Sequence, residues 1–225
     1  GAGPSGPARA VAPETARGRL EVALRELGAA SRDPGLRSVL AFLALWSFSP
    51  GYGAVHDYHL TRGLGLPETL YGDAAAVHAV ACAAASVLYG LYCRRVAMPT
   101  LLHAAIALGV LSSLIGALAR DPSSLMWSSA IGGAAYMSAT LTQLDLAARV
   151  CPPRIAGTVF ALMMATQNLS LGVAGWLGGL VYARLLPELG PMPAYAALAG
   201  AGALFTCGCW ALLPALRRNS GAALL

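Results

Sequence analysis

Residues 155–183 read IAGTVFALMMATQNLSLGVAGWLGGLVYA. The segment is longer than the ~20 apolar residues that a helix needs to cross about 30 Å of hydrocarbon. It contains no Asp, Glu, Lys, Arg or His. It also lacks the period-two alternation of a strand, and lipid offers a backbone no hydrogen-bond partner, so we expect a helix. The segment therefore predicts an integral membrane protein.

Five further apolar runs accompany this segment, at residues 36–60, 71–93, 96–119, 124–147 and 194–216. Hydrophobic residues make up 57% of the 225-residue chain and charged residues 11%, against about 25% charged in an ordinary soluble domain. This composition excludes a soluble globule, and five cysteines are too few for a disulfide-stapled secreted scaffold. We predict an all-α, polytopic membrane protein with six transmembrane helices over residues 36–218.

The two ends of the chain differ from this bundle. Residues 1–35 begin with a Gly/Pro-rich stretch, and residues 14–27 have the pattern of a short amphipathic helix. We predict a cytoplasmic-side linker over residues 1–35 and a tail over residues 219–225. Because the chain begins at Gly1 rather than Met, we expect it to be a fragment or a processed product.

The distribution of arginine predicts the orientation in the membrane. All fifteen basic residues are Arg. Twelve lie in the N-terminal segment, in the loops after the second and fourth spans, and after the sixth span, whereas three lie in the other loops. Basic residues concentrate on the cytoplasmic side, so both termini are expected on a cytoplasmic or stromal side. The membrane itself, plasma or organellar (plastid included), stays open.

Polar residues line one face of the first span. Ser49, Tyr52, His56 and His59 follow one another at i, i+3, i+7 and i+10, and Asp57 lies on the adjacent face. Polar groups at this depth face protein or a water-filled cavity. The stripe therefore predicts a solute pathway, and it also makes His56 or Asp57 a candidate proton-linked group.

Pro50 and Gly51 interrupt the same span. Proline removes a backbone donor and kinks a helix, and glycine adds conformational freedom. We therefore predict a kinked first helix that takes part in gating.

The fourth and fifth spans carry matching polar residues. Tyr136, Thr140 and Gln143 recur at i, i+4 and i+7, and Gln167 and Asn168 lie near the middle of the fifth span. The third span has few polar residues, and the sixth has so few that we expect it to face lipid. The predicted cavity-lining residues are Tyr52, His56, Asp57, Tyr136, Gln143, Gln167 and Asn168.

Other readings of these residues stay open. Asp57 and Asp145 lie near the membrane boundaries, where a carboxylate can be merely interfacial. Gln167 and Asn168 can serve helix–helix hydrogen bonding instead of a substrate. His78 and His103 are single residues on apolar helices, where packing is the simpler explanation.

The sequence contains no phosphate-binding loop, nucleophile elbow or HExxH motif. We therefore expect no enzymatic activity, no metal, no cofactor and no nucleic-acid partner. One redox alternative is a six-span haem protein that pairs His56 or His59 with His78. The expected partners are a small-molecule solute, possible coupling protons and the lipid bilayer.

Several segments resemble known transporters. GLYCRR at 90–95 is similar to the Gly-rich, Arg-bearing loop of the major facilitator superfamily. WSFSPGYG at 46–53, LGL at 64–66 and AARVCPPRIAGTVFALMM at 147–164, continuing to Asn168, resemble the folate–biopterin transporter family within it. The resemblance covers about residues 35–218.

This resemblance implies the carboxy-terminal six-helix half of a secondary transporter. Such a transporter moves a small organic solute, here folate- or pterin-like, by alternating access, and the first, second, fourth and fifth helices of each half line its cavity. The implied partner is an amino-terminal half or a second copy. A truncated, non-transporting membrane subunit is the alternative.

The chain departs from the family at two places. After Cys-Pro-x the family commonly has Gly and, two positions on, an acid, where this chain has Arg154 and Ala156. No arginine lies deep in a span, so either the carboxylates of a folate are recognised on the absent half or the substrate differs. The predicted gating and loop residues are Pro50, Gly51, Arg94, Arg95 and Arg154.

Overall fold

The computed structural model describes residue 28, residues 32–151 and residues 156–219, and these residues form helices and short connections without a strand. The α-helices are α2 (Pro34–Ser47), α3 (Ala54–Tyr58), α4 (Glu68–Tyr92), α5 (Met98–Ile115), α6 (Pro122–Val150), α7 (Ala156–Leu189) and α8 (Pro191–Asn219). A π-helical turn, η1 (His59–Gly63), follows α3, and a 3₁₀ turn, η2 (Gly116–Leu118), follows α5. The predicted helix at 14–27 and Arg154 lie outside the described residues.

The first predicted span is broken, whereas each of the other five corresponds to one continuous helix. Helix α2 ends at Ser47, and the chain resumes helical form only at Ala54. Pro50 offers no amide for a helical hydrogen bond, and Gly53 has a φ of 71°, outside the right-handed helical region. The expectation of one kinked helix over residues 36–60 is therefore wrong, because proline and glycine together end the helix.

Four of the described helices are long and apolar enough to cross a membrane: α4, α5 together with η2, α7, and α8. Helix α2 is apolar but has 14 residues. Helix α6 has 29 residues and carries Ser, Thr, Gln and Asp along its length. Length and composition thus support an all-helical membrane protein without establishing six separate crossings.

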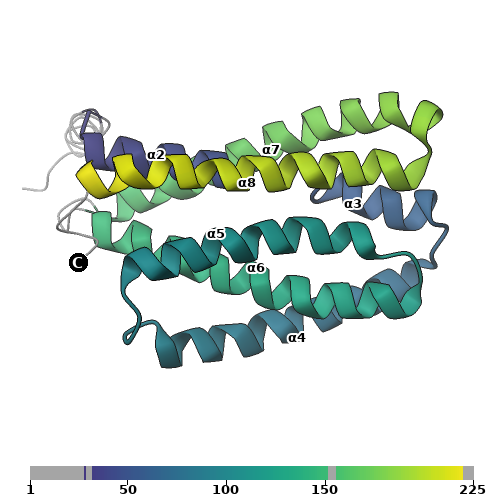
Figure 1. The fold of residues 1–225 in the computed structure, drawn as a ribbon, viewed down its shortest axis with the longest axis horizontal. Helices are drawn as coiled ribbons and strands as arrows, with labels where there is room; N and C mark the ends of the chain where they lie inside the picture. The colour runs from purple at the N-terminus through teal and green to yellow at the C-terminus, as the bar shows by residue number, and fades with distance from the viewer. Residues whose placement is uncertain (1–27, 29–31, 152–155, 220–225) are drawn as a thin grey trace, which may run out of the picture.

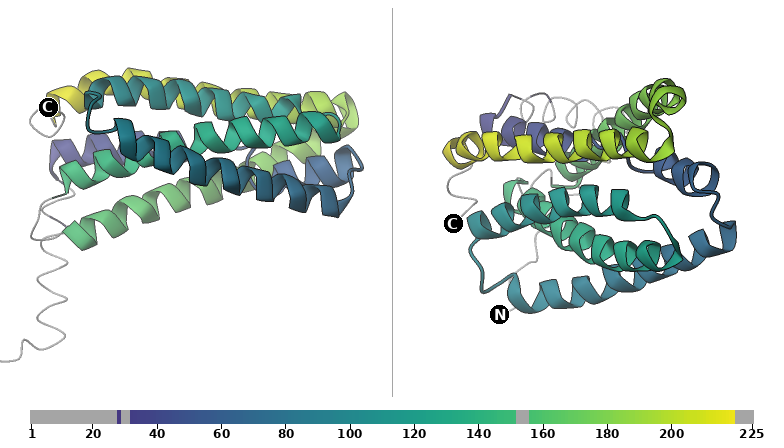
Figure 2. Two further views of the ribbon diagram at one scale, coloured as in Figure 1. Left: turned by 90° about the horizontal axis from the view of Figure 1, so that it is seen from below. Right: turned by 45° about the vertical axis from the view of Figure 1, so that its right-hand side comes forward.

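The helices run roughly parallel to the long axis of the molecule in two groups. Figure 1 shows α2, α7 and α8 along one side and α4, α5 and α6 along the other, with α3 near the end opposite the C-terminus. Contacts between α5 and α8 join the groups, and Figure 2 shows the same arrangement from two further directions. The two ends of the described bundle meet, since Asn219 Nδ2 donates a hydrogen bond of 2.7 Å to Ser38 Oγ.

Most of the apolar core lies in the half of the molecule that holds these ends. Its fully buried side chains come from α2, α5, α6, α7 and α8, and include Phe42, Ile106, Leu146, Met163 and Leu216. A smaller cluster at the opposite end surrounds Val55, Tyr182 and Tyr195. The two clusters pack the helices together near the two ends of the bundle. The residues between the clusters are less closely packed.

Helix α8, the sixth predicted span, packs one face against protein and leaves the other exposed, with Leu204 74% exposed. Ten of its residues are buried, and it packs against α2, α5 and α7. Small residues make this close packing possible: a Cβ at Gly202 would lie 3.0 Å from Ser49 Oγ. Part of the apolar surface of α8 is thus used for packing against protein, and the expectation that its exposed face meets lipid stays a prediction.

Candidate functional site

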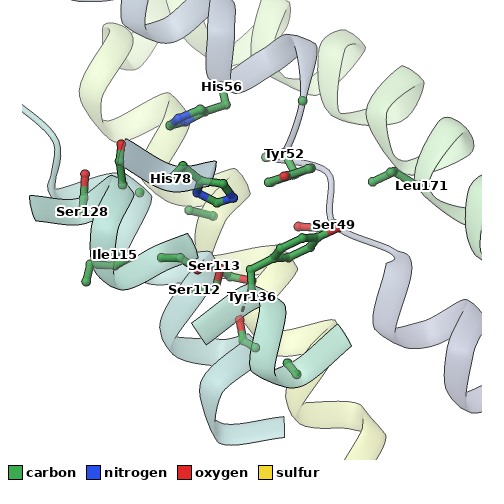
Figure 3. Close-up of a pocket in the computed structure, with 18 of the residues that line it drawn as sticks. Ser49, Tyr52, His56, His78, Ser112, Ser113, Ile115, Ser128, Tyr136 and Leu171 are labelled. Carbon is green, nitrogen blue, oxygen red and sulfur yellow. Dashed lines mark hydrogen bonds between the residues drawn. The ribbon is translucent and has the colours of Figure 1, made fainter. Parts of the chain in front are cut away.

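A cavity of about 450 Å³ lies between the helices. Its walls come from the residues around the break between α2 and α3 and from helices α3 to α8. Figure 3 shows several of the side chains that line it. The volume falls within the range of about 300–1,000 Å³ that is usual for small-molecule sites. The cavity is therefore large enough for a small organic ligand.

All seven predicted cavity residues line this space: Tyr52, His56, Asp57, Tyr136, Gln143, Gln167 and Asn168. They come from four separate parts of the chain, and the fold brings together residues as far apart in the sequence as Tyr52 and Asn168, which are 116 positions apart. Their role in binding a solute remains a prediction.

The helix break shapes one wall of the cavity. Ser49 and Tyr52 lie within the unwound segment and line the cavity (Figure 3). Pro50 and Gly51 are buried between α7 and α8: a Cβ at Gly178 would overlap the Pro50 carbonyl oxygen, and a Cβ at Gly51 would lie 3.0 Å from the Ala199 nitrogen. Glycines on the neighbouring helices thus make room for the irregular backbone.

Aromatic rings form a second wall. Tyr52 and Tyr136 stack with their ring centroids 6.1 Å apart and their planes at 16°. His78 lies beside them, with its ring centroid 6.0 Å from that of Tyr136. The tyrosine side chains are 43% and 38% exposed, so part of each ring is open to the cavity.

Side-chain amides from α6 and α7 supply hydrogen-bonding groups in a third part of the cavity wall. Gln167 Nε2 of α7 donates a hydrogen bond of 2.7 Å to Gln143 Oε1 of α6. Gln143 is only 3% exposed, whereas the neighbouring Asn168 is exposed and lines the cavity. The helix–helix bond expected as one alternative is therefore present, and the same amides also border the cavity.

Histidine–tyrosine contacts join α3 and η1 to α7 and α8 beside the cavity. His56 Nδ1 and the Tyr195 hydroxyl are 2.6 Å apart, and His59 Nδ1 and the Tyr182 hydroxyl are 3.3 Å apart. The His59 ring stacks on Tyr195 with centroids 4.3 Å apart, and His59 is 1% exposed. His59 therefore does not line the cavity, because Tyr182 and Tyr195 enclose its ring on the protein side of α3.

Asp57 is the single charged residue in the cavity wall among the residues that the structure describes. Its Oδ1 accepts a hydrogen bond of 2.9 Å from the Tyr71 hydroxyl of α4. Asp145, in contrast, forms an ion pair with Arg149 on the same helix at 3.2 Å. The two carboxylates that looked alike in the sequence thus have different surroundings.

The cavity also includes residues that the sequence did not single out as candidate site residues: His78, Ser112, Ser113, Ser128, Ser129, Tyr71 and Tyr195. The serines gave no distinctive signal because serine in a helix commonly bonds its own backbone, as Ser113 does to the Gly109 carbonyl at 3.0 Å. Tyr195 had no polar neighbour at helical spacing.

Two of the predicted gating residues, Arg94 and Arg95, do not line the cavity. Arg94 and Arg95 occupy the exposed turn between α4 and α5. Neither forms an ion pair with any residue in the described ranges. A group of three or more side chains suited to a metal ion does not occur among those residues either.

Comparison with known proteins gives the chain a family. A profile of the BT1 family matches residues 38–186. "Probable folate-biopterin transporter 4" of Arabidopsis thaliana is 28% identical over 170 residues, which are 71% of this chain and 35% of that protein. The chain thus spans about a third of the length of this relative.

A solved structure has the same fold. It is a bacterial homologue of the human lysosomal transporter Spinster, in an inward-facing and unoccupied conformation, and it aligns with a TM-score of 0.63 and 18% identity. The alignment covers 99% of this chain and 54% of that one. The profile match over about two thirds of the chain places it in the BT1 family.

Proposed function

We propose that the chain forms one six-helix half of a secondary transporter, which carries a small organic solute across a membrane by alternating access. The observation that carries the proposal is the polar cavity beside a broken helix, in the middle of an apolar bundle. Transporters bind substrates near the bilayer midplane between discontinuous helices. We propose that the broken first span, which contains Pro50 and Gly51, changes conformation during gating.

The proposed substrate is folate- or pterin-like, in line with the name of the Arabidopsis relative. Two features of the cavity support a planar heterocycle. The exposed parts of the Tyr52 and Tyr136 rings suit stacking on a flat ring, and the amides of Gln143, Gln167 and Asn168 can bond the donors and acceptors on its edge.

The same cavity contains no Arg or Lys among its described lining residues. Asp57 would repel a carboxylate. We therefore assign the uncharged, planar part of the solute to this half, and the anionic part to a second half.

Two exposed helix faces support such a second half as the partner. On α4, Val80, Val87 and Leu91 are 65–71% exposed, and on α7 Leu169 and Trp176 are 70% and 66% exposed. A covering partner, either an amino-terminal half or a second copy, would remove these apolar side chains from water or lipid. The coverage of 54% of the Spinster homologue agrees with this arrangement.

Uptake of radiolabelled folate and of a radiolabelled pterin by the full-length protein in liposomes tests this function. We expect Asn168→Ala to reduce the initial rate at low solute concentration about tenfold, since a lost hydrogen bond of about 1–1.5 kcal/mol corresponds to that factor. Asn219→Ala is the matched control because Asn219 does not line the cavity; since it loses its hydrogen bond to Ser38, its thermal unfolding midpoint is measured beside its uptake rate.

Two results would contradict the proposal. Equal uptake by the Asn168 variant and the wild type would remove Asn168 from the binding site. Absence of uptake of any tested solute by the folded full-length protein would favour a non-transporting membrane subunit.

A further inference from the structure

Three polar side chains meet on the outside of the bundle, away from the cavity. Nε1 of Trp210 on α8 lies 3.1 Å from Nδ1 of His103 on α5, and a guanidinium nitrogen of Arg217, also on α8, lies 3.2 Å from Nε2 of the same imidazole. All three residues are exposed. Figure 1 shows that the start of α5 and the end of α8 lie at the same end of the molecule.

This cluster has more donors than acceptors. An indole and a guanidinium only donate hydrogen bonds, and a neutral imidazole accepts at one nitrogen and donates at the other. At most one of the two contacts to His103 is therefore a hydrogen bond, and a protonated ring can accept neither. At least one donor, and the whole positive charge of Arg217, is therefore left for a group outside the cluster, either water or a bound acceptor.

No described residue supplies that acceptor. Arg217 forms no ion pair within residues 32–151 and 156–219. It stands two positions before the end of α8, and side chains on a helix lean toward its N-terminus, so its guanidinium points back along the bundle toward Trp210. The charge of Arg217 therefore lies beside an indole and an imidazole on the outer surface. The imidazole belongs to His103, which stands five residues, or about 7–8 Å of helical rise, after the start of α5 at Met98.

We infer that this cluster, formed by His103, Trp210 and Arg217, binds the phosphate of an anionic phospholipid headgroup. A phosphodiester oxygen accepts hydrogen bonds from guanidinium, indole and imidazole N–H groups alike and neutralises the cation. Tryptophan and arginine at this level are typical of the membrane–water interface, and basic sites between membrane helices bind anionic headgroups. The site is separate from the cavity and does not depend on the proposed transport function.

The experiment measures quenching of Trp210 fluorescence by brominated lipids in the full-length protein, with every other tryptophan replaced by Phe, those at 46, 127 and 176 included. We expect brominated phosphatidylglycerol to quench Trp210 at lower mole fraction than brominated phosphatidylcholine. Arg217→Gln should weaken the apparent affinity for phosphatidylglycerol about fivefold, the size of effect expected for one cation at a membrane surface.

Arg218→Gln is the matched control, since it removes the same charge from the neighbouring exposed position. It should keep the preference for phosphatidylglycerol, and the midpoint of thermal unfolding shows that both variants are folded. Equal quenching by the two lipids, or equal loss in the two variants, would overturn the inference. Removal of the preference by excess inorganic phosphate would show that the site takes free phosphate, and would also overturn the assignment to lipid.

Discussion

Gly178 of α7 and Pro50 of the helix break are in such close contact that a Cβ at position 178 would overlap the Pro50 carbonyl oxygen. The irregular segment between α2 and α3 therefore rests directly on the backbone of α7. The same segment carries Ser49 and Tyr52 into the cavity. The shape of the cavity thus depends on a glycine that does not line it.

Gly178→Ala should destabilise the protein by about 1–3 kcal/mol, because the added methyl group forces the α7 backbone and the Pro50 carbonyl apart. Gly175→Ala is the matched control: it lies on the same helix, and a Cβ added there would meet no neighbouring atom within 4 Å. The higher helix propensity of alanine should therefore leave stability equal or higher in that variant. Thermal unfolding in detergent measures both. Equal unfolding temperatures for the two variants would show that position 178 is not in close contact with Pro50.

Tyr195→Phe should loosen the end of the cavity that α3 closes. The substitution removes the hydroxyl that is 2.6 Å from His56 Nδ1 and should cost about 1 kcal/mol of stability, since the histidine loses its partner. Tyr92→Phe, at the end of α4 far from α3, is the control. Protease sensitivity of the α3 segment should rise in the first variant only, and an unchanged digestion pattern would show that the bond does not hold α3.

Asp57→Asn should reduce uptake and flatten its dependence on pH if this carboxylate exchanges the coupling proton. It is the single charged residue in the described cavity wall, and it accepts a hydrogen bond from Tyr71. Asp73→Asn, on the exposed surface of α4, should leave both the rate and the pH profile unchanged. A wild-type pH profile in the Asp57 variant would exclude the proton-linked role.

The arginine distribution predicts that the turn after α4 and the turn after α5 lie on opposite sides of the membrane. Single cysteines at positions 94 and 120, in a chain whose five native cysteines are replaced by Ser or Ala, should react with an impermeant maleimide from opposite sides. We expect position 94 to be protected in intact cells and labelled only after permeabilisation. Labelling of both positions from one side would refute the proposed topology.

Much of the site could be predicted from spacing alone. Tyr136 and Gln143 are two helical turns apart, and Gln167 and Asn168 stand in an otherwise apolar helix; all four line the cavity. The reason is energetic: a polar side chain within an apolar bundle needs a polar partner or water, so its position along the chain already indicates a cavity or a contact.

Other features could not be predicted in this way. His59 has the same spacing as the cavity residues, yet its ring is buried against Tyr182 and Tyr195. His78 was expected to be a packing residue and instead borders the cavity beside Tyr136. Each of these outcomes depends on which helix lies opposite.

Local sequence determined the membrane class and the helical content, because apolar length and the lack of hydrogen-bond partners in lipid leave the backbone one main solution. It also determined where the first span breaks, through Pro50 and Gly53. Only the tertiary structure decided that α8 packs inside the bundle, that Tyr195 meets His56, and that the donors of Trp210 and Arg217 converge on His103. These relationships join residues from 107 to 139 positions apart, and no periodicity within a single helix can specify such pairs.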